Sequence, residues 1–84
     1  MLKPEIVRFF GMIIRMYYVD HNPPHIHVKY NGLEAFVLIE SGEILKGKLG
    51  PIALKLINIW IKKYKTELLN MWDSQNIEKL PPLK

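Results

Sequence analysis

All three histidines of the sequence lie in one short stretch, Asp20-His21-Asn22-Pro23-Pro24-His25-Ile26-His27. Histidine titrates near neutral pH and is the commonest metal ligand in proteins, so such a cluster can transfer protons or hold an ion. His25 and His27 are spaced as alternate residues of a β-strand, which places both imidazoles on one face. The two prolines stiffen the connection to His21 and Asp20. The sequence therefore predicts that the imidazoles converge on one accessible spot.

One interpretation of this cluster is a metal site. His21, His25 and His27 supply nitrogen donors that Zn²⁺ or Fe²⁺ accepts, and Asp20 would be a further ligand or would orient one of them. A second interpretation is purely structural: Asp20 caps the diproline loop through local hydrogen bonds, and the histidines are half-buried strand residues. The sequence leaves both open: it firmly implies no cofactor, and a divalent metal is a candidate.

A third interpretation is acid–base catalysis without a metal. His25 and His27 would exchange a proton with the 2′-hydroxyl and the leaving oxygen of a ribose, as a small basic ribonuclease does. A nearby cation such as Arg15 or Lys29, or the hydroxyl of Tyr18, would stabilise the charge that develops on the phosphate. His21 is the remaining candidate for a catalytic group in this scheme.

Other basic residues give weaker signals. Arg8 precedes Phe9-Phe10-Gly11 and is either an edge residue lying along apolar surface or an anion contact. Lys62, Lys63 and Lys65 are typical of a solvated helix face, although such a run can also follow a phosphate backbone.

The histidine cluster must be positioned by strands. Four segments have the composition of strands, with β-branched and aromatic residues between turn residues: residues 11–19, 25–30, 33–39 and 43–48. Asn31-Gly32 predicts a two-residue hairpin turn, because both residues tolerate positive φ. That turn fixes the register, pairing Tyr30 with Leu33, Lys29 with Glu34, Val28 with Ala35, His27 with Phe36 and His25 with Leu38. Alternation then predicts a core face of Ile26, Val28, Tyr30, Leu33, Ala35, Val37 and Ile39.

The sequence from residue 51 to about 75 has neither glycine nor proline after Pro51, and its pattern is helical. Apolar residues recur at spacings of three and four: Ala53, Leu56, Ile57, Trp60, Tyr64, Leu68, Met71 and Trp72. The pattern fits one helix, or two with a corner near Lys65-Thr66. Four further apolar residues widen the stripe: Ile52, Leu54, Ile59 and Ile61. Part of the widened stripe is therefore expected to contact a partner.

The chain of 84 residues is therefore predicted to be a single α+β domain spanning residues 1–84. It combines a small antiparallel sheet of three or four strands (residues 11–48) with one or two C-terminal helices on one face (51–75) and a polar tail (76–84). Absence of cysteine excludes disulfides and cysteine-based zinc sites, and the net charge of +4 favours an acidic partner. Apolar runs are too short for a membrane-spanning helix and no signal peptide is evident, so we expect a cytoplasmic protein.

Several motifs of the chain resemble a bacterial family known as domain of unknown function 4160 (DUF4160). The resemblance begins at Arg8-Phe9-Phe10-Gly11 and is most specific at the histidine block from Asp20 to His27. It continues through Gly42-Glu43-Ile44-Leu45-Lys46-Gly47 and Leu49-Gly50-Pro51, and it ends at Leu68-Leu69-Asn70-Met71-Trp72. The chain departs from the family pattern at Gly50 and Ile52, where proline and arginine are more usual.

The resemblance implies a role in a two-gene module of the toxin–antitoxin kind. The protein partner would be the product of a neighbouring gene, similar to domain of unknown function 2442. Carried onto this chain, the family block is Asp20, His21, Pro23, Pro24, His25 and His27, with Arg8 as an additional polar position. The resulting functional hypothesis is a toxin that acts on RNA through the histidine cluster. The alternatives are a non-enzymatic protein-binding module and a histidine-based metal-binding protein; the sequence does not predict the oligomeric state.

Overall fold

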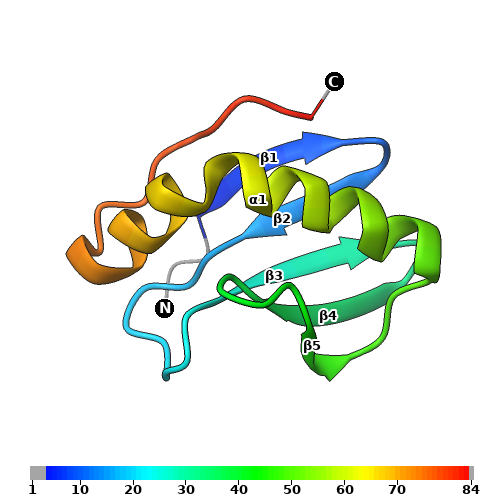
Figure 1. The fold of residues 1–84 in the computed structure, drawn as a ribbon, viewed down its shortest axis with the longest axis horizontal. Coiled ribbons are helices and arrows are strands. Elements are labelled where there is room, and N and C mark those ends of the chain that lie inside the picture. The colour runs from blue at the N-terminus through cyan, green and yellow to red at the C-terminus, as the bar shows by residue number, and fades with distance from the viewer. Residues whose placement is uncertain (1–3, 84) are drawn as a thin grey trace.

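A single antiparallel sheet, crossed on one face by a long helix, forms the structure (Figure 1). This computed structural model describes residues 4–83 of the chain. Each strand pairs with the strand that follows it in sequence, so the sheet order is the chain order. The strands are β1 (Glu5–Phe9), β2 (Met12–Arg15), β3 (His25–Tyr30), β4 (Leu33–Leu38) and β5 (Ile44–Gly47), and the helix is α1 (Pro51–Ser74). The α+β class is confirmed, but the sheet has five strands instead of three or four.

The additional strand comes from the N-terminal hairpin. The strand predicted over residues 11–19 is found as the shorter β2, whereas β1 was not predicted; the chain turns at Phe10 and Gly11 between the two. Both turn residues have positive φ, 52° and 79°, as a tight hairpin turn requires. β1 was missed because its turn to β2 places Phe10 in the left-handed region, which is not expected of a phenylalanine from sequence.

The hairpin of β3 and β4 follows the predicted register. Asn31 and Gly32 form its turn with φ values of 50° and 76°. All the predicted partners are found opposite each other, including His27 with Phe36 and Lys29 with Glu34. The hairpin therefore places His25 and His27 on the sheet face opposite Ile26 and Val28, as the alternation requires.

Helix α1 is kinked at Tyr64 (φ −114°, ψ 23°), where two helical stretches join next to the predicted corner at Lys65-Thr66. Pro51 occupies the first turn, where its missing N–H is tolerated. The helix ends at Gln75, whose left-handed conformation lets its N–H donate to the Met71 carbonyl. Of the apolar residues expected to widen the stripe, Ile61 is buried, whereas Ile52 and Ile59 are exposed.

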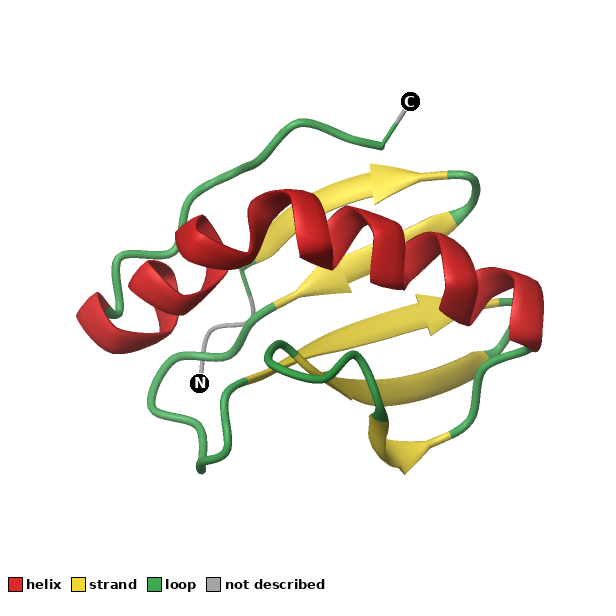
Figure 2. Ribbon diagram, in the orientation of Figure 1, coloured by secondary structure: helices red, strands yellow, loops and turns green. Residues whose placement is uncertain are grey.

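The core lies between α1 and the sheet face that the helix crosses (Figure 2). Trp60 is fully buried, and its ring centroid lies 6.0 Å from that of Phe9. Fully buried strand residues from β1 to β4 surround it: Ile6, Met12, Ile14, Ile26, Val28, Ala35 and Val37. The opposite face of the sheet carries the side chains of His25 and His27.

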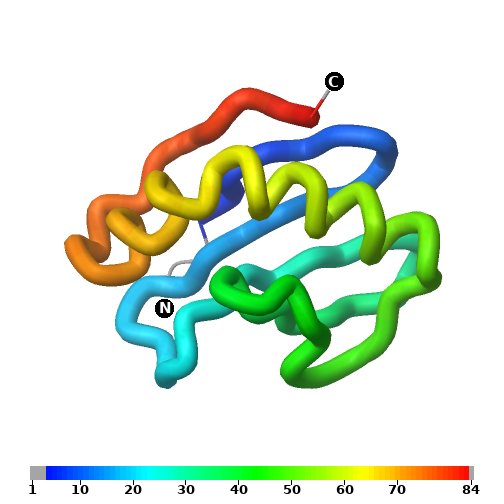
Figure 3. The backbone as a smooth tube through the Cα atoms, in the orientation of Figure 1, coloured from blue at the N-terminus to red at the C-terminus, as the bar shows by residue number. Residues whose placement is uncertain are grey.

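The polar C-terminal tail packs back along the molecule, and Figure 3 shows it running beside β1. The Leu80 N–H donates to the Ile6 carbonyl (3.1 Å), and Trp60 Nε1 donates to the Pro81 carbonyl (2.9 Å). Ile77, Leu80 and Leu83 pack against the core. Within residues 4–83, no helix combines the length and the apolar character that crossing a bilayer would need.

Candidate metal centre

The loop between β2 and β3 carries Asp20 over the beginning of β3. Asp20 Oδ1 accepts the backbone N–H of His21 (2.8 Å), which fixes the carboxylate locally. Two hydrogen bonds fasten the loop to the end of α1: the Val19 N–H donates to Gln75 Oε1 (2.6 Å), and Trp72 Nε1 donates to Asn22 Oδ1 (3.1 Å). The position of Asp20 thus depends on contacts with the end of α1 between residues that are 50 and 56 positions apart in sequence.

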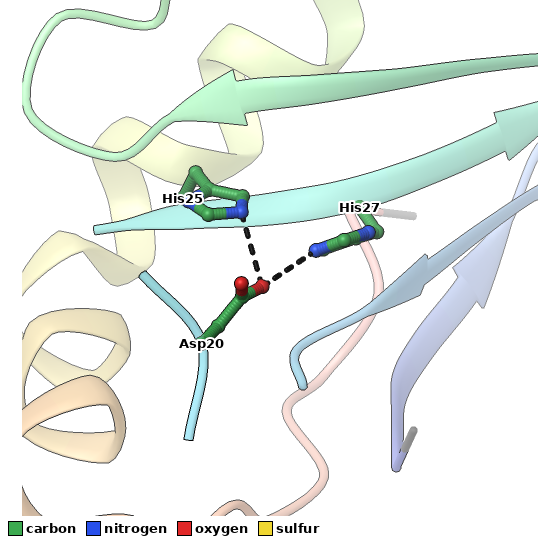
Figure 4. A group of neighbouring side chains, drawn as sticks. All are labelled: Asp20, His25 and His27. Carbon is green, nitrogen blue, oxygen red and sulfur yellow. Dashed lines mark hydrogen bonds and ion pairs between the residues drawn. The ribbon is translucent and has the colours of Figure 1, made fainter. Parts of the chain in front are cut away.

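One carboxylate oxygen faces both strand histidines (Figure 4). Asp20 Oδ2 lies 3.0 Å from His27 Nε2 and 3.1 Å from His25 Nε2. The three ligand atoms all lie within 4.8 Å of one another. Among the described residues this is the group of histidine and carboxylate side chains that is close enough to share one metal ion.

The hydrogen atoms of His25 can be assigned from its contacts. Its Nδ1 lies 2.8 Å from the Pro23 carbonyl, and a carbonyl oxygen only accepts, so Nδ1 carries the proton. In a neutral ring Nε2 then holds a lone pair, which lies beside the lone pairs of Asp20 Oδ2. Although the two atoms are 3.1 Å apart, their geometry does not form a hydrogen bond, and this buried nitrogen has no hydrogen-bond partner within residues 4–83. A second proton on His25 or a bound cation would remove the repulsion.

Aromatic rings enclose the two imidazoles. The ring of Tyr17 stacks on His27 at 3.9 Å between centroids, and Phe36 lies 4.1 Å from the same ring. The His25 ring is 5.3 Å from Phe36 and 5.2 Å from Trp72. His25 is consequently only 3% exposed and His27 only 6%. Both rings are held in place but are nearly sealed from solvent.

The environment sets the charges of the site. Burial lowers the pKa of His27, and the hydrogen bond to Asp20 opposes this effect without cancelling it. Burial by itself raises the pKa of Asp20, but the hydrogen bonds from His27 and from the His21 backbone outweigh it and lower that pKa. At neutral pH the site therefore combines an ionised carboxylate with a neutral His27 imidazole, which is the ligand form that transition metals bind.

The structure brings together Asp20, His25 and His27 but not His21. The side chain of His21 is exposed, and it does not belong to the group of converging ligand atoms. The expected convergence of three imidazoles on an accessible spot is thus corrected to two buried imidazoles and a carboxylate. The reason is that the side chain of Asp20, next to His21 in the loop, is the one that turns towards β3.

The other predicted site residues lie around this group. Arg15 is half-buried and directly opposite His27 in the sheet. Lys29 is exposed beside Glu34, and Tyr18 is a half-buried loop residue. Arg8 lies on β1 and forms an ion pair with Glu5 (2.8 Å). The catalytic and binding roles assigned to these residues remain predictions.

Sequence reasoning missed three residues that shape the site. Tyr17 and Trp72 contact the imidazoles directly, and Asn22 connects the loop to Trp72. Of the aromatic residues that contact the imidazoles, the sequence predicted only Phe36, because the register set by the Asn31-Gly32 turn places it opposite His27. No pattern in the sequence indicates that the end of α1 reaches the beginning of β3.

Comparison with known proteins assigns the chain to a family. No curated protein and no solved structure matches it significantly. The profile of a domain of unknown function, DUF4160, matches residues 11–73, which are 63 of the 84 residues and include the whole of the loop, Asp20, His25 and His27. The chain therefore belongs to the DUF4160 family.

Proposed function

We propose that this protein binds a divalent transition-metal ion through Asp20 Oδ2, His25 Nε2 and His27 Nε2. The observation that carries the proposal is that His25 Nε2 lies 3.1 Å from Asp20 Oδ2 without forming a hydrogen bond to it. Because Nδ1 already donates to the Pro23 carbonyl, the neutral ring has no hydrogen to place between these two atoms. A cation between them converts a repulsive contact into two coordinate bonds.

The spacing of the ligand atoms supports this assignment. Zinc binds imidazole nitrogen and carboxylate oxygen at about 2.0–2.2 Å in tetrahedral geometry, so its ligand atoms lie roughly 3.4 Å from one another. The separations of 3.0 and 3.1 Å between Oδ2 and the two imidazole nitrogens approach that value. Two histidines and one carboxylate also suit Fe²⁺. Nδ1 of His27 has no hydrogen-bond partner among the described residues.

Burial of the rings argues for metal binding over direct RNA cleavage. General acid–base catalysis requires the imidazole to come within hydrogen-bond distance of the ribose hydroxyl. His25 and His27 are 3% and 6% exposed under Tyr17, Phe36 and Trp72, so a ribose could reach them only if the loop opened. A small ion requires no such opening, because one edge of the site is the partly exposed Asp20 carboxylate.

The test is metal binding by protein that has been stripped with EDTA. Calorimetric titration with Zn²⁺ or with anaerobic Fe²⁺ should show one equivalent bound, whereas Mg²⁺, which prefers oxygen ligands, should not bind. At a free metal concentration of 100 Kd, binding adds about 2.7 kcal/mol to the free energy of unfolding. For a domain of this size that corresponds to a rise in Tm of roughly 10–20 °C.

Three variants locate the ion. Asp20→Asn keeps the shape of the side chain and should weaken metal binding at least tenfold, and His25→Ala should do the same. His21→Ala is the matched control, because it removes an exposed histidine of the same loop and should bind metal as the wild type does. Circular dichroism verifies that each variant is folded. The proposal is wrong if the wild type binds no transition metal at millimolar concentration, or if His21→Ala weakens binding as much as His25→Ala.

A further inference from the structure

A hollow away from the histidines lies between α1 and the loop that joins β4 to β5. Its volume is about 460 Å³, within the range of ligand sites. Lys55, Lys62 and Lys65 line it from the helix, and Ser41 and Gly42 line it from the loop. Figure 1 shows this loop curling beside the helix.

The loop side of the hollow is fixed to the helix at two points. Asn58 Nδ2 donates to the Gly42 carbonyl (3.0 Å), and Lys65 Nζ donates to the Glu40 carbonyl (3.0 Å) while pairing with the Glu40 carboxylate (3.1 Å). Gly42 has a φ of 77°, and a Cβ at this position would overlap the Asn58 side chain. The hollow is therefore formed in the free protein and needs no rearrangement to accept a ligand.

The helix side of the hollow carries uncompensated positive charge. Lys55 and Lys62 are exposed, and neither has an ion-pair partner in the described part of the chain, unlike Lys65. Residues 44–66 contain six lysines, which are half of the twelve lysines and arginines of the protein, and no acidic residue. Lys55 and Lys62 are two helical turns apart, so their Cα atoms are separated by about 10 Å along the axis.

We propose that this hollow binds the phosphate backbone of a single-stranded nucleic acid. Two cations about 10 Å apart along a helix suit separate phosphates of an extended polyanion better than one compact phosphate group. Ile59, which is 47% exposed, lines the same hollow and offers apolar contact to a ribose or base. The chain lacks the glycine-rich loop with which a mononucleotide site usually holds its phosphates.

The experiment measures binding of a fluorescently labelled ten-nucleotide oligouridylate by fluorescence anisotropy across a series of salt concentrations. The wild type should bind with an affinity that falls steeply with salt. Lys55→Gln/Lys62→Gln should weaken binding at least tenfold and reduce the slope of log K against log salt by about 1.4, because each phosphate contact to a single strand contributes about 0.7. The matched control is Lys46→Gln/Lys48→Gln, which removes the same charge from exposed lysines outside the hollow and should weaken binding less than threefold.

Three results would overturn the proposal. The first is no binding of the oligonucleotide by the wild type at low salt. The second is an equal loss of affinity in both double variants, which would reflect net charge alone. The third is that uridine monophosphate binds as tightly as the oligonucleotide, which would make the hollow a mononucleotide pocket. All four substituted lysines are exposed, so both variants are expected to fold, and their melting curves verify this.

Discussion

At the residue scale, His27 makes the stability of the fold depend on pH. Its folded-state pKa is lower than the unfolded value of about 6.5, so between these two values the unfolded chain binds more protons. The free energy of unfolding should therefore fall as the pH drops from about 7 through 6.5 towards the lowered pKa. The lowered pKa of Asp20 adds a separate loss as the pH falls below about 3.8.

Urea denaturation in EDTA between pH 5 and 8 measures the contribution of His27. His27→Gln should show a smaller decline in stability over this range than the wild type, whatever its absolute stability. His21→Gln changes an exposed histidine and should decline as the wild type does. An unchanged decline in His27→Gln would show that burial of this ring does not govern the pH dependence.

The composition of the site could be predicted only in part. The alternation along β3 placed His25 and His27 on one face, and the turn register placed Phe36 beside them. Asp20, and not His21, joins the two strand histidines, because its side chain is the one that turns towards β3. This orientation of a loop residue could not be predicted from the sequence. Burial of the rings depends on Trp72, which is far away in sequence, and no local pattern encodes that contact.

At the element scale, two glycines with positive φ differ in what surrounds them, and the effect of this difference on stability can be measured. Gly32 and Gly47 both have positive φ, 76° and 89°, but a Cβ on Gly32 meets nothing within 4 Å. A Cβ on Gly47 would overlap the Glu34 carbonyl oxygen and lie 2.9 Å from the Ala35 Cα. Gly32→Ala should cost about 1 kcal/mol of stability from backbone strain alone. Gly47→Ala should cost roughly 3 kcal/mol, because strain and backbone overlap add.

Chemical denaturation of the two glycine variants and of the wild type measures the loss in free energy of unfolding that each substitution causes. Equal losses would mean that the β4–β5 pair moves apart readily to admit a methyl group. The comparison is matched, because both substitutions add the same atoms in the same backbone region.

Elements with strong local signals were predictable from the sequence, and those with weak signals were not. Asn31-Gly32 specified a hairpin and its full register, and the three- and four-residue spacing specified α1. The β1–β2 hairpin was missed because its turn uses Phe10 in a conformation that this residue seldom adopts.

At the scale of the whole molecule, stability depends on one core between α1 and the sheet. Leu68 is fully buried there, whereas Leu45 on the edge strand is 46% exposed. Leu68→Ala should cost about 2–5 kcal/mol, because it removes apolar contact and leaves a cavity. Leu45→Ala removes the same atoms from a partly solvated position and should cost less than about 1 kcal/mol.

Thermal and urea denaturation of these two leucine variants tests the position of the core. Similar losses for both would contradict the arrangement of α1 over the sheet. The sequence predicted this arrangement from the apolar stripe, but it did not predict that the polar tail returns to accept a hydrogen bond from Trp60 at Pro81. That contact forms between segments whose sequences carry no matching pattern.

The central claim is that Asp20, His25 and His27 hold one metal ion, and anomalous diffraction tests it most directly. Crystals of the EDTA-stripped protein soaked with Zn²⁺ should show one strong anomalous peak at the zinc edge. The peak should lie about 2.0–2.2 Å from Asp20 Oδ2 and from Nε2 of both histidines. A zinc peak at the exposed His21, or no peak beside these three atoms, would contradict the claim.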